Sequence, residues 1–177
     1  MEIKLELPTA GREQDALGYR DEFREHDSEL NGDGGLGKAE DYGNWVQEKL
    51  DWHKGLNVPE KFVPSSTYFA VRGSDDRVVG MIDLRHRLNE YLTKSWNGHI
   101  GYSVRPTERK KGYATEMLRL ALEECVGRGI SPVIVGCDAD NIGSKKTILK
   151  HGGVLKHESV QDDKPHLGFE INLGGSS

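Results

Sequence analysis

The sequence contains little cysteine and no long hydrophobic run. Its two cysteines, Cys125 and Cys137, do not have the spacing of metal ligands, so we interpret them as free thiols in a reducing compartment. No stretch approaches the roughly 18 apolar residues of a membrane-spanning helix. Residues 1–7 alternate polar and apolar side chains and lack the apolar core of a signal peptide. We therefore expect a cytoplasmic protein that contacts neither a membrane nor a metal ion.

Charged residues are abundant but unevenly distributed. They make up 30% of the 177 residues, a length that fits one domain with a sizeable core. Residues 1–60 hold 15 acidic and 7 basic side chains, whereas residues 61–177 hold 14 and 17. The acidic part is either an ordinary solvated surface or the side on which a positively charged partner binds. Without repeats or a linker, we predict one domain over residues 1–173 and a flexible tail over 174–177.

The periodicity of apolar residues predicts an α/β (α+β) fold. In the first part it indicates a strand at 3–7 and two helices, at about 12–26 and 39–53. In the second part the predicted strands are 67–71, 78–84, 98–104 and 132–137, and the predicted helices are 112–128 and 141–151. The chain then closes with a hairpin of strands 154–160 and 166–173 around the turn 161–165. A strand–helix–strand unit of this size is a right-handed crossover, so strands 98–104 and 132–137 should be parallel. We predict a mixed, mainly antiparallel sheet of six to seven strands, with one parallel pair and helices on both faces.

A basic, glycine-containing turn joins the strand ending at Val104 to the following helix. The first N–H groups of a helix have no internal partner, and the helix dipole adds partial positive charge there. Arg109, Lys110 and Lys111 contribute three cations, and Gly112 lets the backbone approach a ligand closely. This pattern favours a bound polyphosphate.

The motif Arg109-x-x-Gly112-x-Ala114 resembles the pyrophosphate loop of the GNAT superfamily of acyl-CoA-dependent N-acetyltransferases. Residues 138–146, in which an Asn opens a helix, resemble the second motif of that superfamily, and residues 152–155 resemble the turn before its last hairpin. The order and separation of these motifs over residues 96–155 make the resemblance specific. It implies a GNAT-like fold with acetyl-CoA as co-substrate.

The resemblance also implies which residues hold the cofactor. Backbone groups of Tyr102, Ser103 and Val104 would bind the pantetheine arm. Asn141 and Ser144 would contact the pantetheine or the diphosphate, although Asn141 also fits a helix N-cap. The residues that would hold the diphosphate are Arg109, Lys110, Lys111, Gly112, Tyr113, Ala114 and Thr115.

The catalytic groups are less clearly marked. Many relatives carry a Tyr on the Asn-helix as the acid for the departing thiolate, but Ile148 stands at that position here. Candidates for the base are His99, Asp83 and Glu170, and we choose His99 because its ordinary pKa suits proton transfer near neutrality. His99 also fits a surface or sheet-pairing histidine. The segment 83–89, with Trp96, either lines the acceptor side or forms an exposed edge strand protected by its charges.

The loop at residues 29–40 carries two competing motifs. Residues 32–38 match a nucleotide P-loop, but Ala39 replaces the Ser or Thr that holds magnesium, and no apolar strand precedes the loop. The same loop also resembles a calcium-binding EF-hand, with its ligand positions at Glu29, Asn31, Asp33 and Glu40, and Gly34 at the turn. Neither motif is complete, so we predict no metal site.

We therefore predict an N-acetyltransferase that moves an acetyl group from acetyl-CoA directly to a primary amine. The acceptor would be a small-molecule or peptide amine, positively charged before it loses its proton, and we expect no nucleic acid partner. A non-catalytic acyl-CoA-binding module or sensor is the alternative, because no acid or base is firmly assigned. The oligomeric state stays open, a homodimer included.

Overall fold

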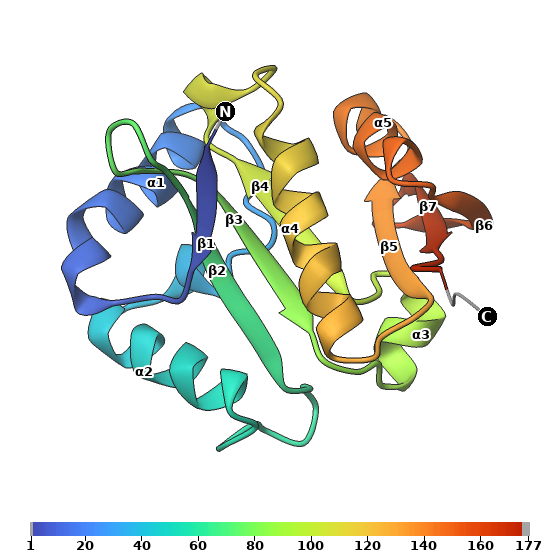
Figure 1. Ribbon diagram of the computed structural model, residues 1–177, viewed down its shortest axis with the longest axis horizontal. Coiled ribbons are helices and arrows are strands. Elements are labelled where there is room, and N and C mark those ends of the chain that lie inside the picture. The colour runs from blue at the N-terminus through green and yellow to red at the C-terminus, as the bar shows by residue number, and fades with distance from the viewer. Residues whose placement is uncertain (1, 175–177) are drawn as a thin grey trace.

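The computed structural model describes residues 2–174, and seven strands of this part form one mixed sheet in the order β1-β2-β3-β4-β5-β7-β6 (Figure 1). Neighbouring strands are antiparallel except β4 and β5, which are parallel. The predicted sheet with one parallel pair is therefore confirmed. The strands are β1 (Ile3–Glu6), β2 (Ser65–Arg72), β3 (Arg77–Arg85), β4 (Ile100–Val104), β5 (Val133–Asp138), β6 (Val154–Gln161) and β7 (Lys164–Ile171).

Helices cover both faces of the sheet, as predicted (Figure 1). Helices α1 and α2 pack on one face, and α4 with α5 packs on the other. The α-helices are α1 (Glu13–Glu25), α2 (Tyr42–His53), α3 (Glu90–Ser95), α4 (Tyr113–Gly127) and α5 (Ile142–Lys150), and the short 3-10 helices are η1 (Ala10–Arg12), η2 (Leu36–Lys38) and η3 (Pro106–Glu108).

Each face has its own hydrophobic core because each helix presents one apolar stripe. Met117, Leu118 and Ala121 of α4 are fully buried against the sheet, where they meet strand residues that point to the same side. On the opposite face, Tyr19 and Phe23 of α1 are buried in a second cluster. Burying a large apolar side chain stabilises a fold by about 1.5–3 kcal/mol. The two cores therefore hold the strands rigidly between two helical layers.

Two local predictions differ from the structure, and one helix was not predicted. Residues 90–95 form α3, which begins where the Asn89 side chain accepts a hydrogen bond from Leu92 N–H at 2.9 Å. The turn of the last hairpin is tighter than predicted, because Asp162 and Asp163 both adopt positive φ and let the strands run up to it. The edge-strand reading of residues 83–89 is wrong, since β3 lies between β2 and β4.

The remaining expectations concern the ends of the chain and membranes. Apart from Gly174, the predicted tail lies outside the described residues. Within residues 2–174, no helix combines the length and apolar character needed to cross a membrane. The single-domain prediction stays a prediction, although the strands of this part all join one sheet.

Candidate functional site

The parallel strands β4 and β5 part after a single pairing. Ile100 is paired with Val135, whereas β4 continues alongside β3 as far as Val104. Beyond Ile100, the backbone N–H and C=O groups on the edge of β4 that faces β5 are therefore not paired with another strand. A cavity of about 520 Å³ opens where the strands diverge and where α4 begins.

This cavity brings together the residues predicted to bind the cofactor, with one exception. Lys111 does not line it. Gly112, with φ at 87°, is the N-cap of α4 and turns the chain so that the first N–H groups of the helix are free of helical partners. The predicted residues that line the cavity are Tyr102, Ser103, Val104, Arg109, Lys110, Gly112, Tyr113, Ala114, Thr115, Asn141 and Ser144.

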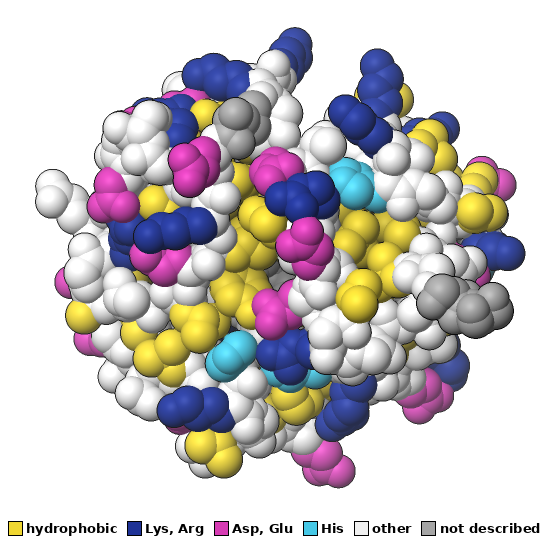
Figure 2. Space-filling view, viewed as in Figure 1, with side chains coloured by type: hydrophobic (Ala, Val, Ile, Leu, Met, Phe, Trp, Pro, Cys, Tyr) yellow, Lys and Arg dark blue, Asp and Glu magenta, His cyan; other side chains and the backbone are white. Residues whose placement is uncertain are grey.

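The three cations of the turn have different positions. Lys110 lines the cavity with a left-handed backbone at φ 63°. Arg109 also lines it; its guanidinium donates to Ser28 Oγ at 2.8 Å and lies 5.5 Å above the ring of Phe23. Lys111 instead donates to Glu108 at 2.7 Å. Figure 2 shows a notch between the loop before α4 and helix α5, with Lys and Arg side chains rising on both sides.

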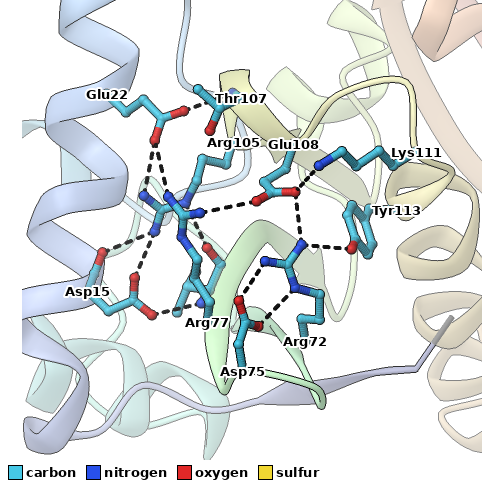
Figure 3. A network of polar contacts seen from close by, with 11 residues as sticks. Asp15, Glu22, Arg72, Asp75, Arg77, Arg105, Thr107, Glu108, Lys111 and Tyr113 are labelled. Atoms are coloured by element: carbon cyan, nitrogen blue, oxygen red, sulfur yellow. Dashed lines mark hydrogen bonds and ion pairs between the residues drawn. The ribbon is translucent and has the colours of Figure 1, made fainter.

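A buried ion-pair network holds this turn against α1 (Figure 3). The guanidinium of Arg105 donates to Asp15 at 2.7 Å and to Glu22 at 3.1 Å, and Glu22 also accepts from Thr107 N–H at 2.8 Å. Burial alone would raise the pKa of Glu22, but the hydrogen bonds from Thr107 and Arg105 lower it overall. Residues 105–107 are therefore fixed to a helix more than eighty positions earlier in the chain.

Glu108 anchors the other side of the same turn. It is 5% exposed and accepts hydrogen bonds from Lys111, Arg72 and Arg77 at 2.7, 2.9 and 3.1 Å (Figure 3). The Lys111 hydrogen bond, supported by Arg72, lowers the pKa of Glu108 despite its burial. Sequence reasoning missed Glu108 and Arg105, although a lone acidic residue within a run of cations was the available signal. Lys111 serves this network rather than the cavity.

A phenol lies where the Asn-helix approaches β4. Tyr102 OH is 2.7 Å from the hydroxyl of Ser144 in α5, and burial raises the pKa of Tyr102 to about 12. Ile148, at the position of the superfamily tyrosine, is fully buried. Asn141 caps α5 by accepting from Ser144 N–H at 3.1 Å and also lines the cavity, so its two predicted roles are compatible.

A second cavity, of about 730 Å³, lies between α2 and the ends of β2 and β3. Aromatic side chains line it, among them Trp45, Trp52 and Phe62. A third cavity of about 360 Å³ connects the two regions, since it shares Tyr102 and Ser144 with the first and Arg85 with the second. The three cavities are therefore neighbours in the region where β4 and β5 diverge.

The loop at residues 29–35 separates the first cavity from the second. Glu29 lines the first cavity and Glu40 the second, so two of the proposed calcium ligands face different spaces. Asp33 accepts from Gly37 N–H at 2.7 Å. In residues 2–174, no three His, Cys, Asp or Glu side chains gather as a metal site would require. The P-loop comparison also lacks support, because this loop leads into the short η2 rather than a long helix.

The predicted base His99 is buried between β4 and β5 and lines none of the three cavities. Its Nδ1 accepts from Ile134 N–H at 3.0 Å, which occupies one lone pair. Burial, with Arg85 nearby, lowers the pKa of His99 to about 4. This geometry favours a structural histidine that joins the two strands above the point where they part.

Asp83 and His166 are alternative candidates for the base, and their surroundings differ. Asp83 lines the second cavity and accepts from Thr67 Oγ1 at 2.7 Å, and burial raises the pKa of its carboxyl although Arg85 opposes this. His166 lines the third cavity, with Nδ1 3.6 Å from Asp138 and a buried Nε2 that has no hydrogen-bond partner. Sequence reasoning missed His166, since its neighbour Asp138 lies on another strand. Glu170 lines none of the three cavities.

Comparison with known proteins decides the family. The sequence pattern of the acetyltransferase (GNAT) family matches residues 22–152. The chain belongs to this family. A curated relative, the uncharacterized N-acetyltransferase YjdG of Bacillus subtilis, is 33% identical over 63 residues, which span 35% of this chain and 38% of the relative.

Solved structures of GNAT proteins share the fold at low sequence identity. The ribosomal-protein-S5-alanine acetyltransferase of Vibrio fischeri has a TM-score of 0.76 at 14% identity, covering 100% of this chain and 97% of that one. The microcin C7 self-immunity acetyltransferase MccE, solved with acetyl-CoA and AMP, has a TM-score of 0.69 at 14% identity, covering 97% and 93%. Acetyl-CoA is the co-substrate of this family, and the donors around the first cavity fit its diphosphate.

Proposed function

We propose that this GNAT protein transfers an acetyl group from acetyl-CoA directly to the primary amine of an acceptor. The observation that carries the proposal is the first cavity, in which free helical N–H groups, Gly112 and Lys110 meet the unpaired edge of β4. Groups of this kind bind a diphosphate and an extended amide-containing arm. The thioester would then lie in the gap between β4 and β5.

The surrounding residues support a direct transfer. The amine nitrogen forms a bond to the thioester carbon, the carbon–sulfur bond breaks, the amine loses a proton and the sulfur gains one. We propose that Asp83 takes up the amine proton, because burial raises the pKa of its carboxyl group toward neutral pH and so makes the carboxylate a stronger base. Tyr102, which keeps its proton at neutral pH, would donate a hydrogen bond to the departing sulfur from the α5 side.

The expectation of a positively charged acceptor rested on the acidic first part of the chain. Asp15 and Glu22 from that part are paired with Arg105, so they do not attract an acceptor. Carboxylates of the second cavity, Asp83 among them, still favour an amine that arrives as an ammonium ion.

The test compares two glycines at opposite ends of α4. Gly112 and Gly129 both have positive φ, at 87° and 70°, so a valine strains either backbone similarly, but Gly112 alone of the two lines the cavity. We expect Gly112→Val to weaken CoA binding at least about a hundredfold in calorimetry, because several backbone hydrogen bonds to phosphate are lost. Gly129→Val should bind CoA normally. Equal affinities in the two variants would contradict the assigned site.

Turnover distinguishes the enzyme from a binding module. Wild-type protein should release free CoA steadily when acetyl-CoA and a suitable amine are supplied. Tight CoA binding without such release over a broad panel of amines would support a sensor instead.

A further inference from the structure

The charged side chains inside the second cavity differ in what they still offer to a ligand. The charged lining residues that are not exposed to solvent are Asp33, Lys49, Asp83 and Arg85. Both carboxylates already accept hydrogen bonds, from Gly37 N–H and from Thr67 Oγ1. The inner acidic groups are therefore at least partly satisfied within the protein.

The inner cations keep free donors. The guanidinium of Arg85 donates to Gly98 O at 2.9 Å, and its closest carboxylate among the described residues, Asp83, is 3.9 Å away. Lys49, with 3% of its side chain exposed, lies 3.6 Å above the ring of Trp52 and 3.6 Å from Glu48. A cavity that offers buried donors and apolar walls selects a ligand with an oxygen acceptor and an apolar group.

Arg85 also has a position that Lys49 lacks. It lines both the second cavity and the third one, which reaches Tyr102 and Ser144 at the gap between β4 and β5. A ligand whose oxygen binds Arg85 would place a neighbouring amine beside the third cavity, which borders the gap proposed for the thioester. The planar guanidinium can hold a carboxylate or a carbonyl through parallel N–H donors.

We propose that the acceptor is an α-amine: an apolar amino acid, or the first residue of a peptide, whose carboxylate or carbonyl oxygen binds Arg85. This rests on the proposed acetyl transfer and specifies its substrate class. The chemistry of a peptide N-terminus agrees with the site, since its α-amino group has a pKa of about 7.7–8.0, against about 10.4 for a lysine-type amine. The amine of a peptide N-terminus therefore loses its proton near neutrality without a strong base.

The experiment measures CoA release with matched amines at equal concentrations of the free base. Phenylalanine and phenylalaninamide carry the oxygen next to the amine, whereas 2-phenylethylamine lacks it. We expect kcat/KM to be at least about tenfold higher for one of the first two, as a charge-assisted hydrogen bond predicts. Preference for phenylalanine indicates a free amino acid, and preference for the amide indicates a peptide N-terminus. Leucine, leucinamide and 3-methylbutylamine repeat the comparison with an aliphatic side chain.

Two variants assign the preference to Arg85. Arg85→Gln should remove most of the difference between the matched amines while acetyl-CoA binds as in the wild type. Arg87→Gln is the control, because Arg87 is exposed and lines none of the three cavities. If Arg85→Gln lowers kcat/KM equally for all amines, Arg85 is structural and the inference is wrong.

The wild-type result separates the inference from the proposed function. Turnover of the plain amines as fast as of the α-amines overturns the inference and leaves acetyl transfer intact. No turnover of any amine, with acetyl-CoA bound, overturns both.

Discussion

The phenol of Tyr102 lies on β4 and reaches α5, the helix that Asn141 opens. Its hydroxyl meets Ser144 of α5 at 2.7 Å, while Ile148 of the same helix is fully buried. A side chain on β4 can therefore supply the missing hydrogen-bond donor because β4 and α5 converge on the same cavity.

Replacing Tyr102 by phenylalanine tests this assignment. We expect Tyr102→Phe to lower kcat about a hundredfold, in the range of general acid catalysis, while the Kd of acetyl-CoA stays within about threefold. Ser144→Ala keeps the phenol and removes its partner, so its loss of kcat should be smaller. Stopped-flow and calorimetric measurements separate the two effects. If Tyr102→Phe kept the wild-type kcat, the departing sulfur would receive its proton from solvent and not from Tyr102.

At the scale of elements, the loop between α1 and η2 depends on a close contact with β4. A Cβ placed on Gly32 would lie 2.3 Å from the carbonyl oxygen of Gly101, whereas one on Gly35 would meet nothing within 4 Å. Both glycines have positive φ, so alanine strains either backbone. The difference between the two positions therefore isolates the contact between the loop and the strand.

We expect Gly32→Ala to reduce the free energy of unfolding by about 1–3 kcal/mol more than Gly35→Ala, because the backbone must move to relieve the clash. The displaced loop should also raise KM for the acceptor, since it separates the second cavity, where we propose that the acceptor binds, from the first. Urea denaturation and steady-state kinetics measure the two effects. Equal stabilities of the two alanine variants would show that the loop does not rest on β4.

The elements that sequence reasoning identified are those fixed by local chemistry. The turn before α4 was predictable because Gly112 and the apolar stripe of α4 lie within one segment. The direction in which the Lys111 side chain points was not predictable, because it depends on Glu108. Glu108 is held in turn by Arg72 and Arg77 from another part of the chain. The contact between Gly32 and Gly101 has no local signal either, so the loop resembled a metal site.

For the whole molecule, one buried and one half-buried histidine link stability to pH. Burial, together with nearby Arg128 and His53, lowers the pKa of His86 to about 4, and burial near Arg85 does the same for His99. The ordinary value in an unfolded chain is about 6.5. Between these values the unfolded state binds protons that the folded state does not, so stability falls as pH falls.

The free energy of unfolding should therefore decrease from about pH 6.5 toward pH 4, by up to about 1.4 kcal/mol per pH unit for each histidine. Glu22 and Glu108 act at lower pH: their lowered pKa values stabilise the fold above the unfolded value of about 4.3, and this contribution is lost as pH falls further. Urea unfolding at a series of pH values measures the slope. His86→Asn should remove only a part of the histidine-dependent decrease, because His99 and His53, whose pKa burial also lowers, remain. A flat profile between pH 7 and 5 would mean that both rings can take up protons within the native structure, and His99 would then regain its place as a candidate base.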